Sequence, residues 1–187
     1  MNHQEVNKEL LHFLDHSPNA FYAVANMQKE LEDAGFTREG CPWTLSEGHG
    51  YYVTRNDSAI IAFRIPEGEY KGFQIMASHC DSPVFKIKTN AEIVVDNSYV
   101  KLNVEKYGGM LCAPWLDRPL SVAGRVIVQT EEGIATKLVN VDRDLLIIPN
   151  VAIHMNRQVN DGYAFNAQVD MLPLFCERVR RRISSCS

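Results

Sequence analysis

The part of the chain beyond Pro83 alternates short β-prone runs with turn residues and shows no helical period, and this feature limits the fold most. In 99–105 the apolar side chains of Val100, Leu102 and Val104 alternate with polar ones, as in a strand with one solvated face. Further β-prone runs are 85–88, 92–95, 125–129, 134–141 and 145–148. We therefore expect a β-rich portion from about residue 86 onward.

The first residues of the chain carry helical signals instead. Asn2 and Glu5 are spaced as an N-cap and its partner, which predicts a helix over 3–15. Ser17 as an N-cap predicts a second helix over 18–34. The amino-terminal portion is thus expected to contain at least two helices.

Two β signals follow these helices. Runs 51–54 and 59–65, separated by a polar break, predict a hairpin. The apolar run Phe73–Ala77 predicts a central strand buried on both faces. The expected fold class is therefore α/β, with an α/β portion over 1–85, a β-rich portion over 86–176 and a basic tail over 177–187.

Composition and charge narrow the classes of partner. The formal net charge of −4 argues against nucleic acid or an anionic membrane as the main partner. The longest apolar runs fall short of the ~20 residues needed to cross a bilayer. Five cysteines at wide spacing and an amino terminus without an apolar signal core favour a cytoplasmic protein.

The most polar cluster of the first portion, Ser78–Pro83, comes directly after the expected central strand. In an extended chain His79 and Asp81 lie on one face, as a metal-ligating imidazole and the carboxylate that orients it do. The alternative is a histidine and an aspartate bonded to backbone at a strand end. Spacing alone favours this alternative, because the pattern fixes only two residues.

Cys80 suggests a different chemistry, a thiol hydrolase in which His79 is the base. Adjacent side chains of a strand diverge by about 180°, which keeps the thiol away from the imidazole. A buried, inert thiol is the favoured interpretation.

Two later segments also carry polar residues. The pair Asp117 and Arg118 follows Trp115 and predicts either an exposed ion pair or a buried anchor, both structural. His154 ends an apolar stretch, where a histidine of the core or of a turn is the default.

Seven segments occur in an order that resembles the aspartyl aminopeptidase family of zinc exopeptidases, from about residue 17 to about residue 174. They are SPNAFYAVANMQKELEDAGF, YYVTRNDSAIIAF, ASHCDSP, VEKYGGML, WLDRPLSVAGRV, IPNVAIHMNRQVN and NAQVDMLPL. The resemblance implies that 1–85 is the amino-terminal part of a mixed-sheet catalytic domain and 86–176 a β-rich dimerisation domain. The ending after Leu174 does not resemble the family.

The resemblance also implies a site. Family members bind two zinc ions, release N-terminal and often acidic residues from peptides, and form tetrahedral assemblies of twelve subunits. His79 matches the first zinc ligand and Asp81 the carboxylate two residues on. His154 matches a histidine that reaches a neighbouring subunit's active site.

The chain departs from the family in two respects. Cys80 stands where the family usually has threonine. The remaining zinc ligands, the bridging carboxylate and the glutamate base lie in a part of the catalytic domain that this sequence does not contain. We therefore expect a truncated chain that is inactive alone, with a non-catalytic dimerisation or assembly module as the alternative.

Overall fold

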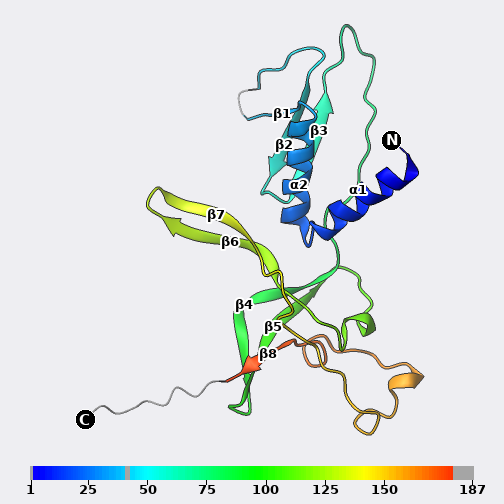
Figure 1. Cartoon of the computed structure of the whole chain (residues 1–187), viewed down its shortest axis with the longest axis vertical. Coiled ribbons are helices and arrows are strands. Elements are labelled where there is room, and N and C mark those ends of the chain that lie inside the picture. Colours follow the sequence, from blue (N-terminus) through cyan, green and yellow to red (C-terminus); the bar gives the residue numbers. More distant parts are fainter. Residues whose placement is uncertain (1, 41–42, 179–187) are drawn as a thin grey trace. The chain divides into compact units, whose positions relative to one another are not determined.

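The structure, a computed structural model, describes residues 2–40 and 43–178. The chain divides into two units. Unit 1 comprises Met1–Ser82 and Ala123–Asn140, and unit 2 comprises Pro83–Val122 and Val141–Ser187 (Figure 1). The division into a catalytic part, a dimerisation domain and a tail remains a prediction.

Helix α1 spans His3–Asp15 and begins as predicted. The Asn2 side chain accepts the N–H groups of Gln4 and Glu5, and the Glu5 carboxylate accepts the N–H of Asn2. This reciprocal pair satisfies amides that the first turn leaves without partners. None of the residues of α1 is buried, so its stability rests on the cap and the helix itself.

Helix α2 spans Ala20–Asp33, and its N-cap is Asn19 rather than the predicted Ser17. The Asn19 carboxamide oxygen accepts the N–H groups of Phe21 and Tyr22. Asparagine and serine cap helices about equally well, so the prediction of Ser17 is wrong by two residues. The hydroxyl of Ser17 instead accepts a hydrogen bond from the Asn26 side chain.

The sheet of unit 1 contains the predicted hairpin. Strands β2 (Gly50–Arg55) and β3 (Ala59–Arg64) are antiparallel, and the short β1 (Thr37–Arg38) runs parallel to β2. The core of the unit includes Tyr52 and Val24, both fully buried. The Tyr52 hydroxyl donates to the Glu32 carboxylate of α2, which joins this helix to the sheet.

A second hairpin, β6 (Ala123–Thr130) with β7 (Gly133–Asn140), also belongs to unit 1. Both strands were predicted: the run 125–129 lies within β6, and the run 134–141 is β7 shifted by one residue. The guanidinium of Arg125 lies over the ring of Phe21 at 4.4 Å and donates to the carbonyl of Asn56 at 2.8 Å. These contacts join the hairpin to α2 and to the β2–β3 turn.

The predicted central strand Phe73–Ala77 is wrong. The segment is irregular, and the exposed fractions of Phe73, Ile75 and Met76 are 83%, 84% and 99%. A strand needs a neighbouring strand to pair its N–H and C=O groups, and no strand of the described residues pairs with this one. Within the described residues, no helix is long and apolar enough to span a membrane.

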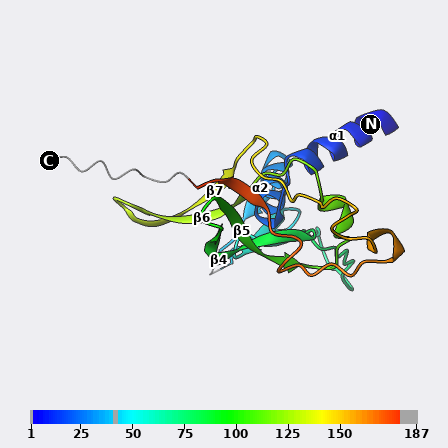
Figure 2. The same cartoon turned by 90° about the horizontal axis from the view of Figure 1, so that it is seen from below.

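Unit 2 is built on an antiparallel sheet in the order β4-β5-β8. Its strands β4 (Val84–Val95), β5 (Tyr99–Tyr107) and β8 (Leu174–Glu177) lie side by side in both views (Figures 1 and 2). The predicted runs 85–88 and 92–95 are two parts of β4, separated by a bulge. Short 3₁₀ turns at η1 (Ala113–Trp115) and η2 (Val159–Asp161) complete the unit.

The core of unit 2 lies against β5. Leu102, Val104 and Leu146 form a buried cluster. The predicted strand 145–148 is not part of a ladder; it makes isolated bridges to Leu116, Leu120 and Leu174. Since Ile148 is fully buried, this segment anchors the chain just before the loop that carries His154.

Candidate functional site

His79 and Asp81 lie in the irregular segment that ends unit 1. The His79 Nδ1 atom is 2.7 Å from the carbonyl oxygen of Asp81 and 3.3 Å from its carboxylate oxygen Oδ1. The imidazole side chain is 82% exposed and the carboxylate 42%. The two groups therefore share a side, as the sequence predicts, although the segment is not a strand.

This contact fixes the chemistry that the imidazole can offer. A neutral imidazole that donates from Nδ1 to Asp81 carries its lone pair on Nε2. Metal-ligating histidines are commonly oriented in this way, with one nitrogen held by a carbonyl or carboxylate and the other on the ion. His79 is thus oriented as a candidate ligand through Nε2.

Cys80 is directed to another part of unit 1. Its thiol donates to the carbonyl of Ser58, in the β2–β3 turn, at 3.2 Å. A thiol nucleophile needs a base within hydrogen-bonding distance, whereas the Cys80 thiol is bound to Ser58 and Nδ1 of His79 is bound to Asp81. The geometry therefore favours a structural thiol.

The structure brings His79 and Asp81 together within unit 1, and His154 belongs to unit 2. His154 lies in a turn closed by the Met155 N–H, which donates to the carbonyl of Ala152 at 2.8 Å. It is exposed, so of the two default interpretations the turn histidine fits and the core histidine does not.

Asp117 has a partner that sequence reasoning missed. Its carboxylate accepts the N–H of Asn150 at 2.8 Å, which places it at the start of the loop that carries His154. The two residues are 33 positions apart, so no local pattern signals the contact. Asp117 therefore has a structural role, as predicted, but its carboxylate binds Asn150 in another segment.

The metal-binding capacity of the chain follows from its donor set. Within 2–40 and 43–178, no group of three or more His, Cys, Asp and Glu side chains is placed to hold a metal ion. A catalytic zinc ion takes about three protein ligands and a water. His79 and Asp81 fit part of such a site and do not complete it, so no catalytic step is assigned to these residues alone.

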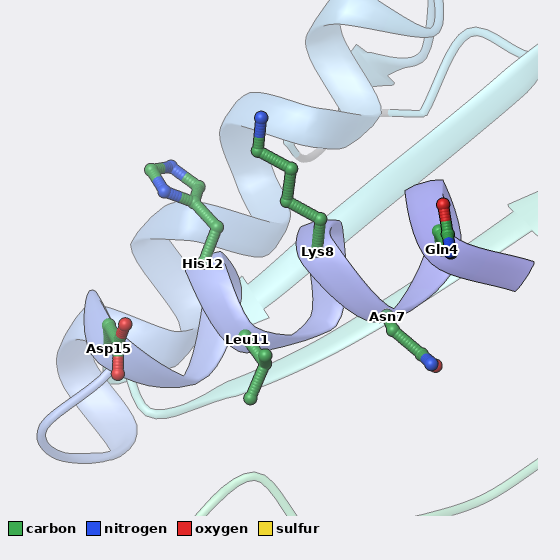
Figure 3. Close-up of a pocket in the computed structure, with 6 residues that line it drawn as sticks. All are labelled: Gln4, Asn7, Lys8, Leu11, His12 and Asp15. Carbon is green, nitrogen blue, oxygen red and sulfur yellow. The ribbon is translucent and has the colours of Figure 1, made fainter.

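A shallow hollow on α1 is not a candidate site. Its six lining residues all come from this one helix, and Lys8 and His12 point away from Leu11 and Asn7 (Figure 3). Binding sites gather polar groups from several elements onto one point. The full lining is Gln4, Asn7, Lys8, Leu11, His12 and Asp15.

A hollow in unit 2 lies along β8. It is lined by the carboxylates of Asp117, Asp144 and Glu177 and by apolar side chains such as Leu146 and Phe175. No histidine or cysteine ligand faces these carboxylates except Cys176. The hollow therefore has no metal-ligand set comparable to the His79–Asp81 pair.

Comparison with known proteins identifies a matching protein family. The model of a family described as "Aminopeptidase I zinc metalloprotease (M18)" matches residues 13–183. The match continues past Leu174, where we expected the resemblance to end, so that expectation is wrong. The family description favours an enzyme over the assembly-module alternative.

Among curated relatives, a "Probable M18 family aminopeptidase 2" of Clostridium acetobutylicum is 48% identical over 179 residues, covering 92% of this chain and 41% of the relative. The chain thus spans about two fifths of the length of that relative.

Two solved structures illustrate the fold. One described as "Cryo-EM structure of the Ape4 and Nbr1 complex" is 35% identical with a TM-score of 0.86, covering 96% of this chain and 35% of that one. One described as the "mApe1 dodecamer" of S. cerevisiae is 21% identical with a TM-score of 0.70, covering 94% and 39%, and shows the fold alone. The small sheets of the mixed α/β structure match these structures.

Proposed function

We propose that the residues of this chain form part of a zinc aminopeptidase that removes N-terminal residues from peptides. The premise is that the chain belongs to the aminopeptidase I zinc metalloprotease (M18) family. The observation that carries the proposal is the pair His79 and Asp81, side by side at 3.3 Å inside the matched range. The Cys80 thiol, directed to Ser58, takes no part in this function.

In this proposal His79 is a zinc ligand through Nε2 and Asp81 orients its ring. When bound, zinc activates a water molecule and polarises the peptide carbonyl. Since the described residues hold fewer than three placed ligands, the remaining ligands of the proposed two-ion site come from outside them. The isolated 187-residue chain is accordingly expected not to hydrolyse peptides.

We further propose that His154 acts in the active site of a neighbouring subunit. Its exposure in a turn supports this, because a side chain that serves another subunit has to leave its own core. A homo-oligomer is part of the proposal, and the similar S. cerevisiae structure is itself described as a dodecamer. A preference for acidic N-terminal residues is part of the proposal and rests on the resemblance alone.

A cytoplasmic location also remains a proposal. Cys80, Cys112 and Cys176 are free thiols, which supports a compartment that keeps cysteines reduced. Fractionation of cells that produce the protein tests it directly.

The proposed activity is tested in a chimera in which this chain replaces the matched part of the Clostridium acetobutylicum relative. Purified chimera is assayed on aspartyl-, glutamyl-, leucyl- and lysyl-nitroanilides with zinc and with a chelator. We expect chelator-sensitive hydrolysis, fastest on the two acidic substrates. The His79→Ala variant should lose activity by at least about 10³-fold, since a ligand is removed.

Cys80→Ala is the matched control, because it changes the residue between the two site residues and removes only the bond to Ser58. It should retain activity within about twofold. A chimera that stays fully active with His79→Ala would refute the assignment of the ligand. Hydrolysis on the leucyl substrate alone would remove the acidic preference and leave the aminopeptidase intact.

A further inference from the structure

Asp117 contacts the chain on both sides of Pro149 in unit 2. Its N–H donates to the carbonyl of Ile148 at 3.0 Å, and its Oδ1 accepts the N–H of Asn150 at 2.8 Å. Pro149 has no N–H of its own and a fixed φ. Because Ile148 is fully buried, Asp117 sets the direction in which the chain leaves the core towards His154.

The backbone of Asp117 is suited to this task. Its φ is +55°, in the left-handed region that aspartate, asparagine and glycine adopt most readily. The preceding residue, Leu116, pairs with Ile148 in a parallel bridge, which holds the backbone in place from the other side. The main chain thereby helps to place the Asp117 carboxylate beside the Asn150 N–H.

Two further hydrogen bonds continue from Asn150 to His154. The Asn150 side-chain oxygen accepts the N–H of Val151 at 2.8 Å. The carbonyl of Ala152 then accepts the N–H of Met155 at 2.8 Å, closing the turn that contains His154.

We propose that Asp117 is a positioning residue, which holds the Asn150 amide and so fixes where the exposed imidazole of His154 is presented. The inference deepens the proposed function and rests on it, because a fixed imidazole matters when it serves a neighbouring active site. Asp117 itself acts through Asn150 and is not assigned a catalytic part.

Three variants of the full chain test the proposal. Asp117→Gly keeps the left-handed backbone and removes the acceptor, whereas Asp117→Asn keeps both the backbone preference and an acceptor oxygen. Asn150→Ala keeps the amide that Asp117 accepts and removes the bond to Val151. Asp96→Gly is the matched control, since Asp96 has φ +48° in the β4–β5 turn of the same unit.

The readouts are the amide exchange rate of residue 150 and the imidazole resonances of His154, both measured by NMR. We expect Asp117→Gly to speed exchange about tenfold, the effect of losing one charge-assisted hydrogen bond, and to shift the His154 resonances. Asp117→Asn should restore both readouts to near the original values. Asp96→Gly should change neither.

Several results would overturn the proposal. One is an unchanged exchange rate in Asp117→Gly, and another is faster exchange with unmoved His154 resonances. A third is Asp117→Asn behaving like Asp117→Gly. If Asp117→Gly does not fold, exchange in the unmodified chain decides: the residue 150 amide should exchange at least about tenfold more slowly than an amide without a hydrogen bond, and exchange at the unprotected rate would overturn the proposal.

These readouts do not require peptidase activity. An inactive chimera would therefore count against the proposed function, whereas unmoved His154 resonances would count against the positioning role of Asp117. The two failures are distinguishable.

Discussion

The contacts of Arg125 predict how strongly the β6–β7 hairpin is held in unit 1. Its side chain is 22% exposed, its Nη1 donates to the carbonyl of Asn56 at 2.8 Å, and its guanidinium lies 4.4 Å from the centre of the Phe21 ring. The carboxylate of Asp57 is 3.9 Å away. The perturbation is Arg125→Met, which keeps much of the aliphatic stem and removes the charge and the donors.

The magnitude follows from these three contacts. A hydrogen bond from a charged donor contributes about 1.5–3 kcal/mol, and a cation–π contact about 0.5–2 kcal/mol. The half-exposed Asp57 at 3.9 Å adds less than about 1 kcal/mol, because solvent screens it. Since the contacts share one group and are not additive, we expect Arg125→Met to lower the free energy of unfolding by about 2–3 kcal/mol.

Urea unfolding followed by tryptophan fluorescence measures this change. Trp43, which stacks on Phe63, reports on unit 1 once Trp115 of unit 2 is replaced by phenylalanine in every variant. With a slope of about 1–3 kcal/mol per molar urea, the midpoint should fall by roughly 1 M. Arg125→Lys, which keeps the charge, should lose about half as much. A loss below about 0.5 kcal/mol for Arg125→Met would refute the reasoning.

Two further predictions concern unit 1. Tyr52→Phe removes the hydroxyl bound to Glu32 and should cost about 1–1.5 kcal/mol in urea unfolding at neutral pH. Burial, followed by the hydrogen bond to Glu32, raises the pKa of Tyr52 above 10.0, so the folded state holds the phenolic proton more tightly than the unfolded state. The free energy of unfolding should therefore fall as the pH rises from about 10 through the raised pKa. The Tyr52→Phe variant should lack this part of the fall. The double variant Ile75→Lys with Met76→Lys should reduce self-association in light scattering and leave the free energy of unfolding within about 0.5 kcal/mol, because both side chains are almost fully exposed. Unchanged scattering would show that this segment is not the associating surface.

Features that depend on neighbours in the sequence were predictable. The capping box of Asn2 and Glu5 spans one helical turn, and it fixes the start of α1 in both sequence and structure. The proximity of His79 and Asp81 needs only residues two apart on one side of the chain. This proximity is present in the structure although the expected strand is absent.

Features that depend on partners distant in the sequence could not be predicted. The run Phe73–Ala77 has the composition of a buried strand, yet a strand forms only beside another strand, and the described residues offer it none. The bond between Asp117 and Asn150 joins positions 33 apart, and a carboxylate beside an arginine in sequence suggested the wrong partner. Of the proposed metal site, only the pair His79 and Asp81 could be predicted from a local pattern, since the described residues hold no larger group of ligands.

The zinc content of the purified chimera, measured by mass spectrometry per subunit, tests the ligand assignment of His79 most directly. We expect the His79→Ala chimera to hold fewer zinc ions than the unmodified chimera, whereas the Cys80→Ala chimera should hold as many. Equal zinc content in the His79→Ala variant would contradict it.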